Sequence, residues 1–379
     1  MIIGLLSCSN HLNSQTTSAS GGRQPVSTAF ASVPQDILNR EIPVIFNKQQ
    51  IELEYTVLNG IFELNFRTPT LAGKAWDIYV FAQASELDIW RRLRLLGGSL
   101  ISVPSGRELF ATWDPVMELG TYAVAHLAAY AVDTKGFVFV QGGSFNNGTS
   151  DVTVSSLYMD KYELTQASYR AVMGTNPSHF SGNPNRPVEQ VSWFNAIEYC
   201  NRRSMQEGLT PCYSYGSNGT NPATWPAGWN TDNSTHTNVS CNWTANGYRL
   251  PTEAEWEFAA RGGNRTHNYS YSGSNTIGDI AWYGTNSGSR THDVGELAAN
   301  ELGIFDLSGN VWEWCWDIIG DYPSGSQNNP RDASSGSYRV ARGGSWFGYS
   351  DYCTVSYRLD SYATYSHAML GFRCVRISP

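Results

Sequence analysis

Residues 342–376 read RGGSWFGYSDYCTVSYRLDSYATYSHAMLGFRCVR and combine two kinds of sequence. The two ends, 342–346 and 371–376, are rich in Gly, Trp, Phe, Cys and Arg, which we interpret as a rigid frame. Between them, five Tyr, four Ser and two Asp are mixed without the period of a buried helix or strand. Tyr offers a large amphipathic contact area at low entropy cost, and Ser and Asp offer adaptable hydrogen bonds. The composition therefore predicts a recognition surface.

The bulk composition limits the classes of partner. The chain has 379 residues, which suggests two domains, and 41% hydrophobic residues, which is ample for buried cores. The net charge is -8 and Lys and Arg are scattered, so we expect no nucleic-acid partner. No apolar run approaches the roughly 20 residues of a membrane-spanning helix. We expect a monomer.

The N-terminus, MIIGLLSC, resembles a bacterial lipoprotein signal in which Cys8 becomes the lipidated first residue. No Lys or Arg precedes its apolar part, which is shorter than the usual ~7 to 15 residues. The alternative is an incidental Cys in a disordered N-terminus. The lipoprotein interpretation predicts export to the outer membrane or cell surface, with membrane contact only through the lipid. Residues 1–32 then form the signal remnant and a flexible Ser/Thr/Asn/Gly-rich tether.

The seven Cys fit this interpretation as one lipidated residue plus six others in an exported protein. The six are Cys200, Cys212, Cys241, Cys315, Cys353 and Cys374. Their pairing does not follow from sequence. There is no CxxC motif, and the His residues lie far apart, so we expect no zinc site.

Residues 33–135 predict a small all-β sandwich of immunoglobulin-like type that acts as a spacer. Asn59-Gly60 between two alternating runs indicates a hairpin. The segment 87–96 fits either a strand or a short helix. Strands are expected at 51–57, 61–66, 76–82, 109–113 and 121–132.

Residues 136–379 open with a strand at 137–140 that breaks into a glycine turn, and they predict helices at 166–172, 192–207 and 252–261. Thr252 caps the third helix, because Glu255 follows three residues later. We therefore interpret Glu253, Glu255 and Glu257 as helix-start and surface charges rather than acid-base catalysts. The long polar insertion between Cys200 and Asn246 predicts part of a functional rim.

Six motifs then occur in a fixed order: GGSF (142–145), YELT (162–165), PVEQVSW (187–193), YRLPTEAEWE (248–257), GNVWEW (309–314) and GFR (371–373). Through them, residues 136–379 resemble formylglycine-generating-enzyme-like (sulfatase-modifying factor) domains. The resemblance implies a C-type-lectin-like fold, rich in loops, with a small twisted antiparallel sheet. The fold class is then α+β: a C-type-lectin-like C-terminal domain preceded by the small all-β domain.

The resemblance first suggests an oxidase that converts a substrate cysteine to formylglycine through two copper-binding thiols. A Cu(I) site of this kind needs a pair of soft sulfur ligands. The family pattern places the two thiols at the positions of Gly348 and Cys353, so one of them is missing. The helical domain with a His/Glu triad that the related iron enzymes add is also missing. We therefore expect no enzyme and no required cofactor, and keep the oxidase as the alternative.

The second hypothesis is a binding protein. The lipoprotein-like start, the added domain and the Tyr/Ser/Asp-rich C-terminus resemble the variable proteins of diversity-generating retroelements, those of Treponema in particular. In that family, error-prone copying of adenines changes chosen surface positions. The resemblance places the variable region at about 338–379, binding an unknown protein or surface ligand. Trp346, Arg358, Phe372 and Arg373 are expected in the frame. The candidate ligand-binding residues are Phe347, Tyr349, Asp351, Tyr352, Tyr357, Asp360, Ser361, Tyr362, Tyr365 and His367.

Two alternatives stay open in this region. Several of these Tyr could be buried in a fold that packs many aromatic residues. Cys353 is either a remnant of the second active-site thiol or half of a disulfide with Cys374 or Cys315. Sugar binding is not expected, because the calcium-dependent Glu-Pro-Asn and Gln-Pro-Asp signatures are absent.

The resemblance also implies a structural calcium ion beside the GNVWEW motif. The matching ligands are Asp306, the backbone carbonyls of Gly309 and Val311, and Glu313. Hard oxygen ligands of this mixed kind suit calcium. The alternative is that Glu313 only joins a hydrogen-bond network among Trp312, Trp314 and Trp316.

Overall fold

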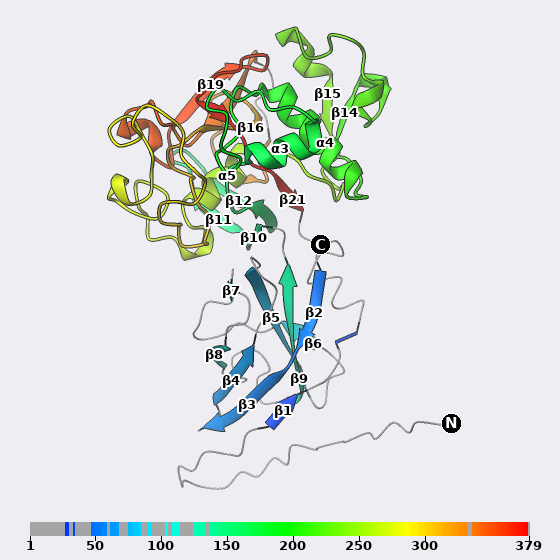
Figure 1. Ribbon diagram of the computed structural model, residues 1–379, viewed down its shortest axis with the longest axis vertical. Coiled ribbons are helices and arrows are strands. Elements are labelled where there is room, and N and C mark those ends of the chain that lie inside the picture. Colours follow the sequence, from blue (N-terminus) through cyan, green and yellow to red (C-terminus); the bar gives the residue numbers. More distant parts are fainter. Residues whose placement is uncertain are drawn as a thin grey trace. The chain divides into compact units, whose positions relative to one another are not determined.

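The chain forms two compact units, the first ending at Lys135 and the second spanning Gly136–Ser378 (Figure 1). Cys8 and most of the predicted tether lie outside the residues that the structure describes. Within the tether, Ser27–Ala29 forms strand β1 instead, so the tether prediction is wrong for these three residues. The computed structural model describes residues 27–29, 33–34, 47–58, 61–67, 75–84, 90–92, 103–104, 108–113, 124–133, 136–331 and 336–377.

The first unit contains two antiparallel sheets with one shared core. Their strand orders are β1-β3-β4-β8 and β2-β9-β5-β6, and β7 pairs with β5. Phe62, Leu64 and Phe66 alternate along β4 toward a core that Val80 and Leu127 of the other sheet also enter. The described strands therefore form the predicted β-sandwich, while its immunoglobulin-like type and spacer role stay predictions. The strand bounds are β1 Ser27–Ala29, β2 Asn47–Ile51, β3 Leu53–Leu58, β4 Ile61–Arg67, β5 Ala75–Ala84, β6 Trp90–Arg92, β7 Val103–Pro104, β8 Glu108–Trp113 and β9 Val124–Asp133.

Two local predictions in this unit can be checked in the pairing. Leu58 lies opposite Ile61, so β3 and β4 are joined across two residues as the Asn-Gly signal predicts. In the ambiguous segment 87–96, Trp90–Arg92 forms a strand beside β5. The helix alternative is therefore wrong for those three residues.

The second unit consists of small sheets, short helices and long loops. Its sheets have the orders β10-β13-β21, β11-β12-β17, β14-β15 and β19-β18-β16-β20. The strand bounds are β10 Phe137–Val140, β11 Gly143–Asn146, β12 Asp151–Val154, β13 Leu157–Asp160, β14 Tyr213–Tyr215, β15 Val239–Cys241, β16 Trp312–Ile318, β17 Gln327–Asn328, β18 Tyr338–Arg342, β19 Arg358–Tyr362, β20 Leu370–Gly371 and β21 Val375–Ile377.

The three α-helices of this unit begin within one residue of the predicted starts. They are α3 Gln166–Met173, α4 Trp193–Gln206 and α5 Glu253–Ala260. The 3-10 helices are η1 Gly216–Asn218, η2 Pro222–Thr224, η3 Asn233–Asn238, η4 Gly263–Arg265, η5 Ile277–Asp279 and η6 Ser350–Cys353. Thr252 and Glu255 form the predicted capping box of α5. Ser192 caps α4 in the same way.

The interpretation of the α5 glutamates as surface charges is wrong. Glu253, Glu255 and Glu257 are all buried. Glu255 binds Arg249 through hydrogen bonds of 2.6 and 2.7 Å, and the other two carboxylates pair with arginines from the C-terminal segment. Buried carboxylates need such partners, because desolvating an unpaired charge is costly.

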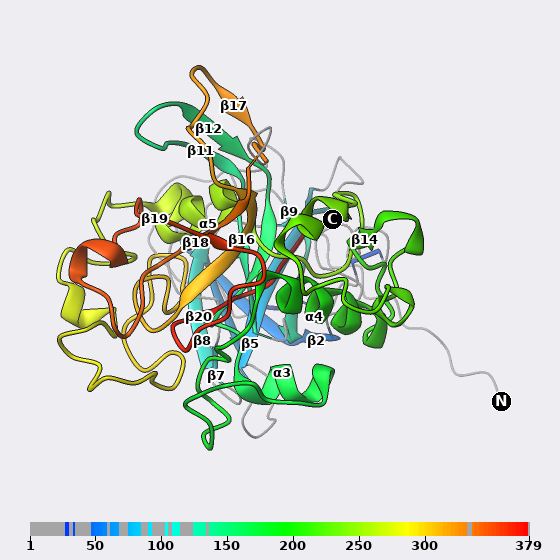
Figure 2. The ribbon, with the colours of Figure 1, turned by 90° about the horizontal axis from the view of Figure 1, so that it is seen from above.

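Strand β16 forms the centre of the unit. All but its last residue is buried, and it pairs antiparallel with β18 and parallel with β20. Figure 2 shows β16, β18 and β19 side by side, close to α5. The chain end returns to the start of the unit, because β21 pairs with β13. Residues 342–376 thus begin in the β19-β18-β16-β20 sheet, at Arg342, and end in the β10-β13-β21 sheet, at Arg376.

The insertion between Cys200 and Asn246 contains β14, β15 and three 3-10 helices. Tyr215, Trp225 and Trp229 are buried together there, with ring centroids 4.5 to 6.0 Å apart. Its part in a functional rim stays a prediction. Within the described ranges, no helix combines the length and apolar character that crossing a membrane requires.

Candidate binding surface

One end of the frame is fixed by a fully buried ion pair. Arg373 donates two hydrogen bonds to Glu313, at 2.7 Å from Nε and 2.6 Å from Nη2, and neither side chain is exposed. Arg373 also donates to the backbone oxygens of Asp160 and Phe305. Trp256 donates its indole N–H to the same Glu313 carboxylate at 2.8 Å. This network ties the C-terminal segment to β16 and α5.

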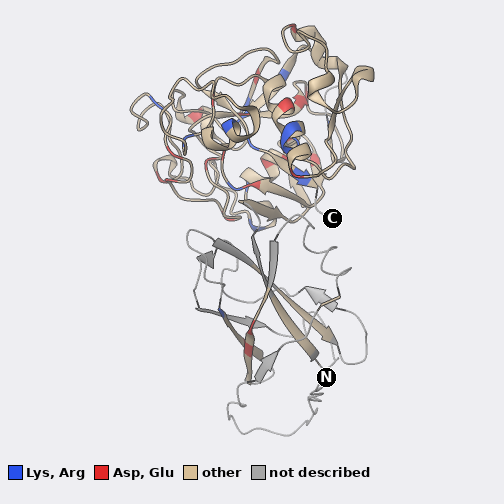
Figure 3. Ribbon diagram, turned by 45° about the vertical axis from the view of Figure 1, so that its right-hand side comes forward, with Lys and Arg blue, Asp and Glu red and all other residues tan. Residues whose placement is uncertain are grey.

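A second set of pairs fixes the other end. Arg358 binds both oxygens of Glu253 at 2.6 and 2.7 Å. Arg342 is fully buried and pairs with both Glu253 and Glu257. Figure 3 shows acidic and basic positions interspersed in the second unit rather than gathered in separate bands. Bidentate pairing of this kind fixes orientation as well as charge.

The turn that opens the frame depends on two glycines, because Gly343 and Gly344 both have positive φ. Gly344 has φ +80°, and a Cβ on it would lie 2.6 Å from Sγ of Cys353. Trp346 follows, with its indole N–H donated to the Ala368 oxygen at 2.8 Å. The turn and this hydrogen bond place Phe347 and the residues after it at the surface.

None of the ten candidate ligand-binding residues is buried. Phe347 and Tyr349 are 67% and 78% exposed, and Tyr362 and Tyr365 are 47% and 46% exposed. Among the described residues, the remaining exposed large hydrophobic side chain is Met205. Burial therefore does not account for these Tyr. Asp351 and Asp360 are also exposed, and Tyr352, Tyr357, Ser361 and His367 are half-buried.

The candidate residues take part in several aromatic groups, one of which is Tyr365 stacked on His367 with ring centroids 6.0 Å apart. Tyr349, Tyr352 and Tyr357 follow one another with ring centroids 5.8 and 4.8 Å apart. Tyr362 stacks on Tyr338 at 4.5 Å, and their hydroxyls are 3.0 Å apart. Tyr338 was not among the candidates, although it lies within the predicted variable region. Its position on β18 directly opposite Tyr362 becomes visible only from the strand pairing.

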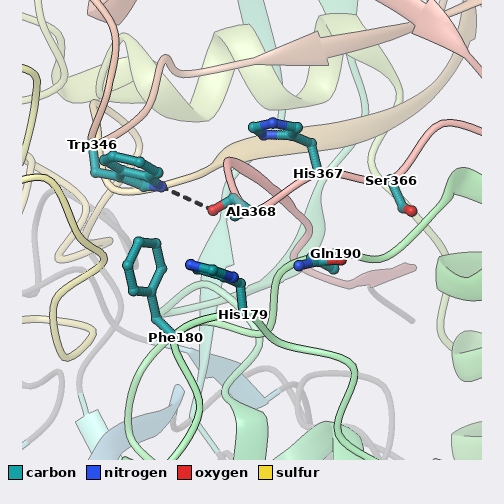
Figure 4. A pocket seen from close by; sticks show the side chains of 7 residues that line it. All are labelled: His179, Phe180, Gln190, Trp346, Ser366, His367 and Ala368. Atoms are coloured by element: carbon teal, nitrogen blue, oxygen red, sulfur yellow. Dashed lines mark hydrogen bonds between the residues drawn. The ribbon is translucent and has the colours of Figure 1, made fainter.

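Three other residues beside this surface were also not predicted from the sequence. His179, Phe180 and Gln190 come from the loop between α3 and α4 and line a pocket with Trp346 and His367 (Figure 4). These residues lie far from 342–376 in sequence. The one local signal was the match of Gln190 to the PVEQVSW motif.

The family resemblance expects two thiols, at positions 348 and 353, and this chain has one of them, at Cys353. Gly348 supplies no side chain, and its carbonyl accepts a hydrogen bond from Gly284 N–H at 2.9 Å. Cys353 is fully buried, and burial raises the pKa of its thiol to about 12. At neutral pH this sulfur is therefore a protonated thiol inside the core.

Two of the predicted calcium ligands already have partners within the protein, and the calcium site stays a prediction. Both oxygens of Glu313 accept from Arg373, so a guanidinium already neutralises this carboxylate. Burial raises the pKa of Asp306 to about 6, and its Oδ2 accepts from Gly295 N–H. In the described part of the chain, no group of three or more His, Cys, Asp or Glu could hold a metal ion. Glu313 does belong to a hydrogen-bond network, but with Trp256 and Arg373 rather than with the three neighbouring Trp.

The six cysteines described are free thiols. Cys353 is therefore not joined to Cys374 or Cys315, and the disulfide alternative for it is wrong in this structure. Cys200 and Cys374 instead face each other, with Sγ atoms 3.7 Å apart and both side chains buried.

The sequence model of the sulfatase-modifying factor enzyme 1-like domain matches residues 124–378. The chain belongs to this family. The match covers the whole described part of the second unit and begins within β9 of the first. The family resemblance and the C-type-lectin-like fold predicted from the ordered motifs are confirmed.

Members of several kinds are similar to this sulfatase-modifying-factor-like chain. The chaperone protein LppX of Paenibacillus barcinonensis is 40% identical over 262 residues, which cover 62% of this chain and 89% of that protein. The solved Treponema denticola variable protein 1 is 35% identical with a TM-score of 0.56, covering 63% of this chain and 94% of that one. The formylglycine-generating enzyme of Streptomyces coelicolor is 30% identical over 214 residues, which cover 52% of this chain and 54% of the enzyme. This chain thus spans about half the length of that enzyme.

Proposed function

We propose that the protein is a surface-displayed receptor that binds protein ligands through residues 347–367 of its sulfatase-modifying-factor-like domain. One observation carries the proposal: four of the five exposed large hydrophobic side chains among the described residues lie in this tract. Clustered exposed aromatic residues mark interaction sites. Tyr and other aromatic residues are also enriched where protein interfaces gain most of their binding energy.

The contrast between structural and exposed residues within 342–376 supports the same proposal. Arg342, Arg358 and Arg373 are paired with carboxylates, whereas the candidate ligand-binding residues are exposed or half-buried. Substitutions at exposed positions away from such networks usually change stability by only about 0.5 kcal/mol. The tract can therefore vary while the fold stays the same, which is what a diversified binding surface requires.

The relatives agree with a binding role. One solved relative is named a variable protein, and the LppX relative is named a chaperone, a class that binds other proteins. By analogy with the variable proteins, we propose that a retroelement diversifies the tract. The expected sign is an imperfect repeat of the gene's 3′ end beside a reverse-transcriptase gene, with differences confined to adenines. Differences spread evenly over all four bases would contradict diversification by this route.

The oxidase alternative lacks its reactive group. Gly348 offers no sulfur, and the Cys353 thiol is buried with a raised pKa. A copper titration combined with an oxidation assay on a cysteine-containing peptide tests this directly. We expect neither stoichiometric copper binding nor turnover, and finding both would overturn the receptor proposal.

The binding surface can be located by selecting ligands from a displayed protein library against the wild-type chain. We expect most selected ligands to lose at least tenfold in affinity, about 1.4 kcal/mol, on Tyr349→Ala or Tyr365→Ala. Met205→Ala is the matched control, because it also removes an exposed large hydrophobic side chain but lies outside the tract. Ligands that respond to Met205→Ala as strongly as to the Tyr variants would show that the tract is not the preferred surface.

A further inference from the structure

A pocket of about 320 Å³ opens beside the candidate binding surface. Figure 4 shows Trp346 and Phe180 on one side of it and Gln190 and Ser366 on the other, with the imidazoles of His179 and His367 between them. This volume is at the small end of the roughly 300–1,000 Å³ that small-molecule sites occupy. The pocket has room for one side chain of a partner rather than for an extended ligand.

The aromatic wall of the pocket is fixed by Trp346 of the frame and by the buried Glu189. The Phe180 ring meets Trp346 edge-on, with centroids 5.1 Å apart and planes at 90°. The buried Glu189 carboxylate accepts the backbone N–H groups of His179 and Phe180 at 3.0 and 2.8 Å. These contacts hold the aromatic wall in place before any ligand arrives.

Gln190 is held in an unusual conformation. Its backbone N–H binds the His367 oxygen at 3.0 Å, and its φ is +57°, in the left-handed region that non-glycine residues seldom adopt. Backbone strain of this kind persists where surrounding contacts enforce it and is concentrated at ligand sites. The strained backbone places the Gln190 carboxamide at the pocket.

The lining decides the chemistry of the occupant. None of the residues that line the pocket carries an acidic, lysine or arginine side chain, so a charged group would lose its hydration without gaining a partner of opposite charge. An aliphatic group would leave the polar wall unpaired. That wall includes the Gln190 carboxamide and the Ser366 hydroxyl. A neutral aromatic ring that carries its own hydrogen-bonding group can pack against the aromatic wall and pair with the polar wall.

We propose that this pocket is the anchor site of the binding surface and takes one tyrosine or tryptophan side chain of the protein ligand. The inference rests on the proposed receptor function. His179, Phe180, Gln190 and Trp346 lie outside the candidate variable positions, whereas His367 is one of them. The anchor site is thus a constant cavity with one variable wall, so related chains share the kind of anchor and differ in the residues around it.

The test uses N-acetyl-L-tyrosinamide as the probe and N-acetyl-L-leucinamide as the apolar control, followed by saturation-transfer NMR on the full chain. We expect saturable binding of the tyrosine probe and none of the leucine probe over the same concentrations. Ala368→Leu fills the pocket, and Gln190→Gly removes the carboxamide while tolerating the positive φ. Each should weaken the tyrosine probe at least tenfold, whereas Met205→Ala, outside the binding surface and the pocket, should change its affinity less than twofold.

Three outcomes overturn the inference: no saturable tyrosine binding, equal binding of the leucine probe, or unchanged binding in both pocket variants. Thermal unfolding of each variant checks that the variant is folded. If Ala368→Leu does not fold, Gln190→Gly alone tests the pocket. These outcomes are separate from the library selection. Selected ligands that depend on Tyr349 but ignore the pocket variants would keep the receptor function and reject the anchor site.

Discussion

Replacing Glu313 by glutamine should destabilise the second unit strongly. The substitution keeps the size of the side chain but removes its charge, so the guanidinium of Arg373, which is fully buried, loses its bidentate partner. Breaking a buried pair by removing one partner costs roughly 3–5 kcal/mol, because the remaining charge is left uncompensated. Trp256 would also keep a weaker acceptor for its indole N–H.

The expected magnitude is at the low end of that range. The pKa of Glu163 is raised well above its usual value by burial and by the charges of Asp306 and Glu313. Replacing Glu313 removes one of the causes that raise the pKa of Glu163, so this nearby carboxyl offsets part of the loss. We expect a loss of about 3 kcal/mol in the free energy of unfolding. For a unit of this size, that loss lowers Tm by about 6–12 °C.

The assay is thermal and urea unfolding followed by near-ultraviolet circular dichroism, which reports the tertiary packing of the aromatic residues. Arg202→Gln is the matched control, because Arg202 and Glu198 form an i,i+4 pair at 2.8 Å on the surface. Such exposed pairs contribute about 0.3–0.5 kcal/mol. A loss below about 1 kcal/mol for Glu313→Gln would refute the view that this pair holds the frame.

Three further predictions concern other parts of the chain. If the protein is exported, oxidation should join Cys200 and Cys374, whose buried Sγ atoms are 3.7 Å apart, and leave Cys353 as a free thiol. Peptide mapping without reductant tests this prediction. A disulfide that contains Cys353 would contradict it. Burial lowers the pKa of His236 to about 4 from 6.5, so its neutral form favours the folded state, and stability from this group should be complete above pH 6.5 and decline as pH falls toward 4. The difference in unfolding free energy between wild type and His236→Gln should therefore change across that window and stay constant above pH 7; a difference that is constant throughout would exclude the mechanism. Expressed from its native gene in a bacterium that processes lipoproteins, the chain should fractionate with membranes and Cys8→Ser should not, whereas equal fractionation of the two would argue against lipidation.

The elements that the sequence predicted well are those specified by neighbouring residues. The start of α5 follows from Thr252 and Glu255, which satisfy each other's backbone groups within one helical turn. The β3–β4 hairpin follows in the same way from two residues between alternating runs. The fold of the second unit required the resemblance, because pairs such as Leu157 and Ile377 in β13 and β21 are too distant for any local pattern.

The sequence predicted the exposed part of the site, because composition indicates exposure. It did not predict the features that depend on partners distant in sequence. The Tyr-rich tract lies at the surface, as its mixed composition indicates. The charges on Glu253 and Glu257 were misassigned to the surface, because their partner Arg342 follows more than eighty residues later. The pocket was missed for the same reason, since the loop that carries His179 and Gln190 is far from Trp346 in sequence.

The irregularity of residues 347–369 has a physical explanation in the anchors that hold them. Cys353, Val355 and Ala363 are buried at uneven intervals, and the side chains between them are mostly exposed or half-buried. Val355 N–H binds the Ser270 oxygen, and Ala363 N–H binds the side-chain oxygen of Asn233. Because these anchors are small side chains and backbone groups, the segment keeps its path whatever the exposed side chains are. A surface of this kind can change its specificity by substitution alone, since neither the anchors nor the buried Arg–Glu pairs depend on the residues that a ligand would contact.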